Sequence, residues 1–268
     1  MSATLPQPTD NTVALVTGAS SGIGADLARE LASRGHGVVL VARRADRLEA
    51  LAAELREAHG VRAEALAADL VDPDAVRALP ERIDALGVEV SILINNAGYG
   101  SAGQFVDLDT RAETDMVRLN CETVVALSGA YAPRFAQKRA GAILVVASSA
   151  AMQPIPGQAT YGASKAFALS FAEALHTELS HLGVAVTALC PGPVETEFAQ
   201  RAGLEDAFDA VPSFARVSSA ECARQAIEGL ERNKRVVAPG LAIRAVGVAG
   251  RHTPRAILLP LMKRFYPA

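Results

Sequence analysis

Tyr161 and Lys165 stand four residues apart in the run YGASK, at the start of a stretch with helical periodicity. This spacing places both side chains on one face of a helix, where a lysine ammonium favours phenolate over phenol. An unperturbed tyrosine titrates near ~10, too high for efficient proton transfer at neutral pH. The pair therefore predicts acid–base chemistry at Tyr161, with Lys165 lowering its pKa. Alone it is a weak signal, because the spacing is common on any helix.

A second chemical signal is the glycine-rich run TGASSGIG at residues 17–24, which joins an apolar run to an amphipathic one. Gly18 permits a tight turn, Gly22 lets backbone approach a pyrophosphate, and Gly24 lets the helix pack on the strand. The helix N-terminus offers N–H groups and partial positive charge to phosphate. The run predicts a nucleotide site with the residues Gly18, Ser20, Ser21, Gly22, Ile23 and Gly24. The alternative is a tight turn that uses glycine for steric reasons alone.

The elements that must position these residues alternate along the chain. Short apolar runs predict strands at residues 13–17, 38–42, 62–68, 92–95, 142–147, 184–190 and 235–238. Amphipathic runs predict helices at 22–34, around 48–55, and at 73–86, 111–139, 160–182 and 220–232. Such alternation predicts one α/β domain over residues 1–268, a single doubly wound parallel sheet with helices on both faces. Ligands of these Rossmann-like sheets bind at the carboxyl ends of the strands.

Further motifs follow the predicted strands in a fixed order. NNAG at residues 95–98 follows the fourth strand, Asn120 lies within the long predicted helix, Ser148 follows the fifth strand, and Pro191-Gly192 follows the sixth. With TGxxxGxG and YxxxK, the chain resembles the classical short-chain dehydrogenase/reductase family over nearly its whole length. The resemblance implies an enzyme that transfers a hydride between a nicotinamide cofactor and a ketone or secondary alcohol.

The resemblance implies a role for each of four catalytic residues. Tyr161 would give its proton to a carbonyl oxygen in reduction and take it back in alcohol oxidation. Lys165 would also contact the nicotinamide ribose, Ser148 would bind the substrate oxygen, and Asn120 would hold a water that links Lys165 to solvent. Family spacing places the serine thirteen residues before the tyrosine, which selects Ser148 over its neighbour Ser149.

The cofactor itself is predicted from the end of the second strand. NAD enzymes carry an acid there, and NADP enzymes an arginine nearby. Here Ala42 stands at that position and Arg43 and Arg44 follow, which predicts NADP(H). The alternative is a solvated arginine pair. The resemblance adds further cofactor contacts, which are Asp69, Leu70, Asn96, Ala97, Gly98, Tyr161, Lys165, Pro191, Gly192, Val194 and Thr196. Asp69 also has a plainer interpretation as a turn residue.

Substrate specificity is expected in a lid at residues 195–217. The lid carries Phe198, Phe208, Val211 and Phe214, and an apolar pocket is completed by Tyr99, Phe105, Met152, Pro154 and Ile155. This favours an uncharged or lipid-like substrate. A 3-oxoacyl thioester reductase would use the same catalytic residues, and a catalytically silent NADP-binding protein is a different class of alternative.

Composition and charge exclude several other classes. The chain has 268 residues, 50% hydrophobic, with a net charge of −3, which gives no overall footprint for nucleic acid. Three scattered cysteines argue against a disulfide framework, and the histidines show no metal-ligand spacing, so no catalytic metal is expected. The N-terminus lacks a signal-peptide pattern and no apolar run reaches membrane-span length. These features predict a soluble, cytoplasmic protein.

The C-terminal extension at residues 240–268 is basic and apolar. No acid follows Glu231, so the tail from Arg232 carries +8 and subtraction leaves −11 for residues 1–231. We expect the extension to pack on its own domain or a partner subunit. Contact with an anionic membrane surface is a second interpretation, which three prolines weaken. The resemblance further implies a homodimer or homotetramer formed through the two long helices.

Overall fold

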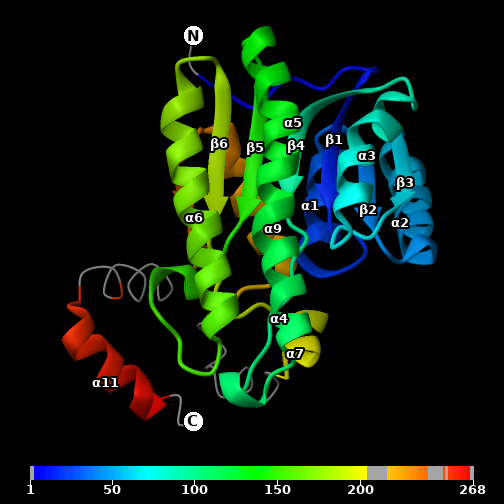
Figure 1. The fold of residues 1–268 in the computed structure, drawn as a ribbon. Helices are drawn as coiled ribbons and strands as arrows, with labels where there is room; N and C mark the ends of the chain where they lie inside the picture. The colour runs from blue at the N-terminus through cyan, green and yellow to red at the C-terminus, as the bar shows by residue number, and fades with distance from the viewer. Residues whose placement is uncertain (1–2, 204–215, 241–249, 251–252, 266–268) are drawn as a thin grey trace.

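The computed structural model describes residues 3–203, 216–240, 250 and 253–265. Within them the strands form one parallel sheet in the order β3-β2-β1-β4-β5-β6-β7 (Figure 1). The chain order reverses between β1 and β4, which makes this the switch point of a doubly wound sheet. The strands are β1 (Thr12–Thr17), β2 (Gly37–Ala42), β3 (Ala63–Ala67), β4 (Glu89–Asn95), β5 (Gly141–Val146), β6 (Val184–Leu189) and β7 (Val236–Val237).

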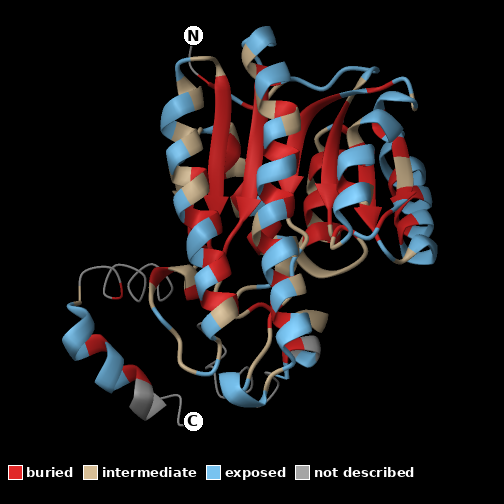
Figure 2. Ribbon diagram, in the orientation of Figure 1, coloured by how far each residue is buried: buried red, intermediate tan, exposed pale blue. Residues whose placement is uncertain are grey.

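Helices cover both faces of this sheet. One layer contains α1 (Gly22–Ser33), α2 (Ala45–His59) and α9 (Ser219–Glu231), and the other α3 (Pro73–Asp84), α5 (Thr123–Lys138) and α6 (Ala159–Ser180). Strand residues alternate between the two cores: in β1, Ala14 and Val16 face the first layer, and Val13 and Leu15 the second. Figure 2 shows that most strand residues are buried, and the edge strand β3 is buried only in part. The predicted fold class is confirmed.

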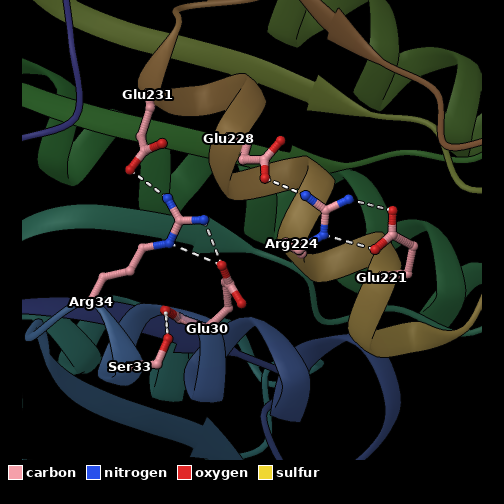
Figure 3. Close-up of polar contacts among 7 residues, drawn as sticks. All are labelled: Glu30, Ser33, Arg34, Glu221, Arg224, Glu228 and Glu231. Carbon is pink, nitrogen blue, oxygen red and sulfur yellow. Dashed lines mark hydrogen bonds and ion pairs between the residues drawn. The ribbon is translucent and has the colours of Figure 1, made fainter.

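Charged side chains also connect α1 to α9. The Arg34 guanidinium contacts Glu30 on α1 and Glu231 at the end of α9, and Arg224 contacts Glu221 and Glu228 along α9 (Figure 3). Partly exposed pairs contribute about 0–1 kcal/mol each. The buried apolar face that the two helices share therefore supplies most of their attachment, through Leu27, Leu31, Ile227 and Leu230.

The predicted long helix at 111–139 is wrong in one respect. It is divided into α4 (Thr110–Val117), a π-helical turn (Arg118–Glu122) and α5, and Asn120 lies in the π turn. Periodicity misses the π turn because it is a single turn, flanked on both sides by residues with ordinary helical spacing. The predicted strands at 62–68 and 235–238 are shorter in the structure. Two 3₁₀ turns, Phe105–Asp107 and Ser149–Met152, were not predicted.

The lid and the C-terminal extension are described in part. The lid contributes the short helix α7 (Glu197–Ala202), while residues 204–215, with Phe208, Val211 and Phe214, lie outside the described residues. In the extension, α11 (Arg255–Phe265) buries Leu258 and Met262 and exposes three other apolar side chains, Ile257, Leu259 and Leu261. In the part of the chain that the structure describes, no helix is long and apolar enough to cross a membrane.

Candidate active site

Thr17 and Asn96 join the two loops that flank the switch point. The Thr17 hydroxyl donates to Ile94 O at 3.0 Å and accepts from Asn96 N at 3.0 Å and Ala97 N at 3.1 Å. The Asn96 amide in turn donates to Thr17 O at 2.8 Å. These bonds fix the loop after β4 against the glycine-rich loop after β1. The sequence analysis did not predict Thr17 as a site residue, although a polar residue ending a fully apolar strand was a usable signal.

Close contacts require glycine at three positions of the glycine-rich loop after β1. Gly18 has φ +68°, and a Cβ there would lie 2.8 Å from Asn96 Nδ2. A Cβ on Gly24 would lie 2.4 Å from Gly18 O, which matches the predicted packing of α1 on the strand end. A Cβ on Gly22 would lie 3.0 Å from Thr196 Cγ2, so this glycine borders the loop after β6. Their contacts with a dinucleotide remain predictions.

We expect Gly24→Ala to destabilise the protein by about 1–3 kcal/mol, the usual cost of inserting a methyl into a packed site. The clash would be with backbone, which cannot move aside cheaply. Gly129→Ala is the matched control, because a Cβ on this helical glycine meets nothing within 4 Å. The control should be neutral or stabilising by up to about 1 kcal/mol. Urea denaturation of both variants measures this, and equal stabilities would contradict the packing role.

Tyr161 and Ser148 meet at the carboxyl end of β5. Tyr161 lies in the first turn of α6 and is only 7% exposed. Burial raises the pKa of Tyr161 to about 12, although the hydrogen bond with Ser148 lowers it. The Ser148 hydroxyl also accepts from Ala150 N at 3.1 Å and so caps the 3₁₀ turn that follows. Ser149 instead anchors the next loop, since its N–H donates to Pro191 O at 2.8 Å.

Lys165 lies one turn further along α6 and is 6% exposed. Its Nζ donates to Val146 O at 2.9 Å and lies 6.0 Å from the centroid of the Tyr161 ring. Burial lowers the pKa of Lys165 to about 8. The hydrogen bond with Ser148 lowers the pKa of Tyr161, while burial acts against both ionised side chains. The expectation that Lys165 also lowers the tyrosine pKa stays a prediction.

Asn120 reaches the same centre from the π turn. Its Nδ2 donates to Tyr99 O at 3.0 Å and Ser164 Oγ at 2.9 Å, and its Oδ1 accepts from Tyr99 N at 3.3 Å. A Cβ on Gly98 would lie 2.8 Å from Asn120 Oδ1 and 3.2 Å from Lys165 Nζ, so Gly98 separates these two groups. The structure thus brings together the four predicted catalytic residues from the loop after β5, the π turn and α6. The water relay through Asn120 stays a prediction.

Replacing the buried ammonium should stabilise the fold. We expect Lys165→Met to raise the free energy of unfolding at pH 7 by up to about 3 kcal/mol, because the folded pKa is about 8 against 10.5 in the unfolded chain. Between these values the unfolded wild type binds more protons, so wild-type stability rises with pH. The advantage of Lys165→Met should therefore shrink from pH 7 to pH 10. Denaturant titrations at both pH values measure this, and a constant difference would contradict it.

The predicted cofactor end of the site carries several arginines. Arg43 is exposed and directly follows Ala42 at the end of β2. Arg44 folds back on the glycine-rich loop, where its Nη2 donates to Ser20 Oγ and to Ser21 Oγ, both at 2.8 Å. The two serines and the arginine therefore form one unit, although the sequence analysis treated them separately. It also missed two further charged residues beside Arg44, which are Arg47 and Glu197.

The remaining predicted cofactor residues line the same edge of the sheet. The Asp69 carboxylate accepts from Val71 N at 3.1 Å, which is the turn role noted above, and Leu70 is buried. After β6, Pro191 and Val194 are buried, and Gly192 and Thr196 are half-buried. The site consists of strand-end loops, glycines at positions where a side chain would fill the space, and arginines at the far end. These features fit a dinucleotide cofactor. Ile23 lies at the start of α1, packed against the core.

An apolar group surrounds Tyr161. Met116 and Ala150 are buried against it, and the half-buried residues Tyr99, Ile155 and Phe198 pack on this cluster. The predicted pocket is wrong for Phe105, which is 61% exposed, and Pro154 is also exposed. Met152 belongs to the core between α6 and the sheet rather than to this group. Among the described residues, no group of three or more His, Cys, Asp or Glu side chains could hold a metal.

Comparison with known proteins decides the family. A family model described as short chain dehydrogenase matches residues 12–207, from β1 into the lid. The chain belongs to the short-chain dehydrogenase family. Among curated relatives, sulfoacetaldehyde reductase 2 of Chromohalobacter salexigens is 37% identical, over 69% of this chain and 74% of the relative. The very-long-chain 3-oxoacyl-CoA reductase of Anas platyrhynchos is 34% identical, over 70% of this chain and 61% of the relative.

Solved structures of short-chain dehydrogenases extend the likeness to nearly the whole chain. One from Sphingobium yanoikuyae, in complex with NADPH, has 39% identity and a TM-score of 0.81, covering 93% of this chain and 95% of that one. The bulky-bulky ketone specific alcohol dehydrogenase of Comamonas testosteroni has 32% identity and a TM-score of 0.75, covering 96% and 93%. This short-chain dehydrogenase is therefore an oxidoreductase of a family that acts on alcohols and carbonyls with a nicotinamide cofactor.

Proposed function

We propose that this short-chain dehydrogenase is an NADPH-dependent reductase of uncharged or lipid-like ketones that also oxidises the corresponding secondary alcohols. The observation that carries the proposal is the buried Tyr161 hydroxyl, hydrogen-bonded to Ser148 inside an apolar group at the strand ends. A phenol held protonated at neutral pH suits proton donation to a carbonyl oxygen. The apolar side chains packed around Tyr161 favour an uncharged substrate.

The residues of the chain act at two ends of the proposed site. Bound nicotinamide supplies the hydride. Tyr161 donates the proton to the carbonyl oxygen, and Ser148 donates a hydrogen bond that stabilises the phenolate left behind. Lys165, held by Val146 O, adds positive charge below pH 8. At the other end, Arg43 and Arg44 receive the 2′-phosphate, for which guanidinium groups form charge-assisted bonds.

Two observations support the choice of cofactor. No acid stands at Ala42 to accept a ribose 2′-hydroxyl, and Arg43 is exposed beside it. Related structures are described as complexes with NADPH or NADP, including the L-sorbose reductase of Gluconobacter frateurii, at 27% identity and a TM-score of 0.76.

The test follows the absorbance of NADPH against a panel of ketones and 3-oxoacyl thioesters. Consumption of NADPH with ketones supports the proposal. Strong preference for 3-oxoacyl thioesters would replace it with the second candidate, which relatives named ketoacyl reductase and 3-oxoacyl-CoA reductase favour. Tight NADPH binding without turnover in either direction would indicate a non-catalytic cofactor-binding protein.

We also infer a homodimer or homotetramer formed through α5 and α6. Val125 on α5 is 43% exposed and Phe167 on α6 is 41% exposed, which leaves apolar surface on both helices. Contact of the basic extension with anionic lipid remains the alternative use of its exposed apolar residues.

A further inference from the structure

The short helix α7 begins with a carboxylate held by two arginines. Glu197 Oε2 lies 2.9 Å from Arg44 Nη1, and Glu197 Oε1 contacts Arg47 Nη1. These bonds lower the pKa of Glu197 to about 2, so the group is ionised throughout the working pH range. The Arg44 and Glu197 side chains are 26% and 34% exposed, so solvent screens their pairing only in part. An anion from this chain thus occupies one of the two arginines assigned to the cofactor.

The next residue on α7 covers the proton donor. The ring centroids of Phe198 and Tyr161 are 5.4 Å apart, with the planes at 46°. Phe198 also reaches the loop after β4, since a Cβ on Gly100 would lie 2.8 Å from Phe198 Cζ. Adjacent residues of one short helix therefore contact both ends of the site. The backbone links the release of Glu197 to the position of Phe198.

We propose that Glu197 occupies the position on Arg44 that the 2′-phosphate of NADPH takes when the cofactor binds. The phosphate then displaces Glu197, and the movement of α7 draws Phe198 away from Tyr161. This inference rests on the proposed use of NADPH. Ser20 and Ser21 also hold Arg44 through Nε and Nη2, so a second anion would compete with Glu197 for Nη1. The carboxylate and a phosphate would repel each other at this distance, which moves α7 outward. Glu197 is then a specificity-determining residue, because NADH carries no phosphate to displace it.

The first test compares cofactor binding by Glu197→Gln and the wild-type enzyme. Removing the competing carboxylate should tighten the binding of NADPH and of adenosine 2′,5′-bisphosphate about two- to fivefold, a factor expected from a partly exposed ion pair. The binding of 5′-AMP should not change. Glu195→Gln is the matched control, because Glu195 is an exposed acid two residues away. Weaker NADPH binding, or an equal gain for 5′-AMP, would overturn the proposal.

The second test reports on Phe198 directly. The chain contains no tryptophan, so Phe198→Trp introduces a single fluorescent probe. Adenosine 2′,5′-bisphosphate should shift its emission to longer wavelength as the ring leaves Tyr161, and 5′-AMP should not. The same shift with both nucleotides, or with neither although both bind, would overturn the coupling. If the wild-type enzyme binds NADH but neither NADPH nor the bisphosphate, the proposed function itself is wrong. The proposed displacement of Glu197 is then wrong as well.

Discussion

Tyr161→Phe should lower the rate of ketone reduction by about 10²–10⁴-fold, the contribution of a positioned general acid. The substitution removes only the hydroxyl, while the ring keeps its contacts with Met116, Ala150 and Phe198. NADPH binding should be close to wild type, because the arginines and the glycine-rich loop are unchanged. Stopped-flow turnover and an equilibrium titration of NADPH separate these two effects.

Tyr131→Phe is the matched control for the loss of a buried tyrosine hydroxyl. Tyr131 is fully buried on α5, and its hydroxyl has no hydrogen-bond partner in the described part of the chain. Removing an unsatisfied buried polar group is neutral or stabilising, so this variant should keep full activity. Comparable losses of activity in both variants would indicate a packing defect, and an active Tyr161→Phe enzyme would contradict the assignment of the proton donor.

Arg43→Glu should change the ratio of NADPH to NADH affinity by about 10²- to 10³-fold in favour of NADH. The substitution removes a charge-assisted bond to the 2′-phosphate and puts a like charge in its place. It also supplies an acid near the position that accepts a ribose 2′-hydroxyl in NAD enzymes. Because Arg43 is exposed, the fold should tolerate the change. Measurements of KM for both cofactors, with one ketone held constant, give the ratio.

Arg56→Glu controls for the change in net charge. Arg56 lies in the last turn of α2, whereas Arg43 precedes the first, and its side chain is 47% exposed. The thirteen positions from Arg43 to Arg56 span roughly 20 Å at the rise of a helix, more than twice the Debye length at physiological salt. This variant should leave the cofactor ratio unchanged. An unchanged ratio in Arg43→Glu as well would mean that the arginine pair is merely solvated and that the cofactor is selected elsewhere.

Strand ends were the part of the site that could be predicted well from the sequence. Gly18, Ser148 and Pro191 each follow a short apolar run, and the carboxyl ends of parallel strands lie at one edge of the sheet whatever their order. Helical spacing likewise placed Tyr161 and Lys165 on one face of α6. Local rules suffice for these residues because each position depends on a few neighbours along the chain.

Contacts between distant segments could not be predicted in the same way. The Glu197–Arg44 pair joins residues 153 positions apart, and Thr17 bonds to a carbonyl 77 positions away. The exposed position of Phe105 was also misjudged, since an apolar residue in a loop does not reveal which way it faces. The π turn at Asn120 was not predicted because it is a single turn between two segments of ordinary helical periodicity.

The sequence by itself predicted the parallel sheet and the family, and it pointed to the side chains proposed to react, because apolar periodicity and short motifs carry that information locally. Only the tertiary structure decided how these groups influence one another. Burial raises the pKa of Tyr161 and the hydrogen bond with Ser148 lowers it, and the extent of burial depends on everything packed around the ring. The tertiary structure also decided the partner of Arg44, which is Glu197 on α7, because the chain after β6 returns to this end of the sheet.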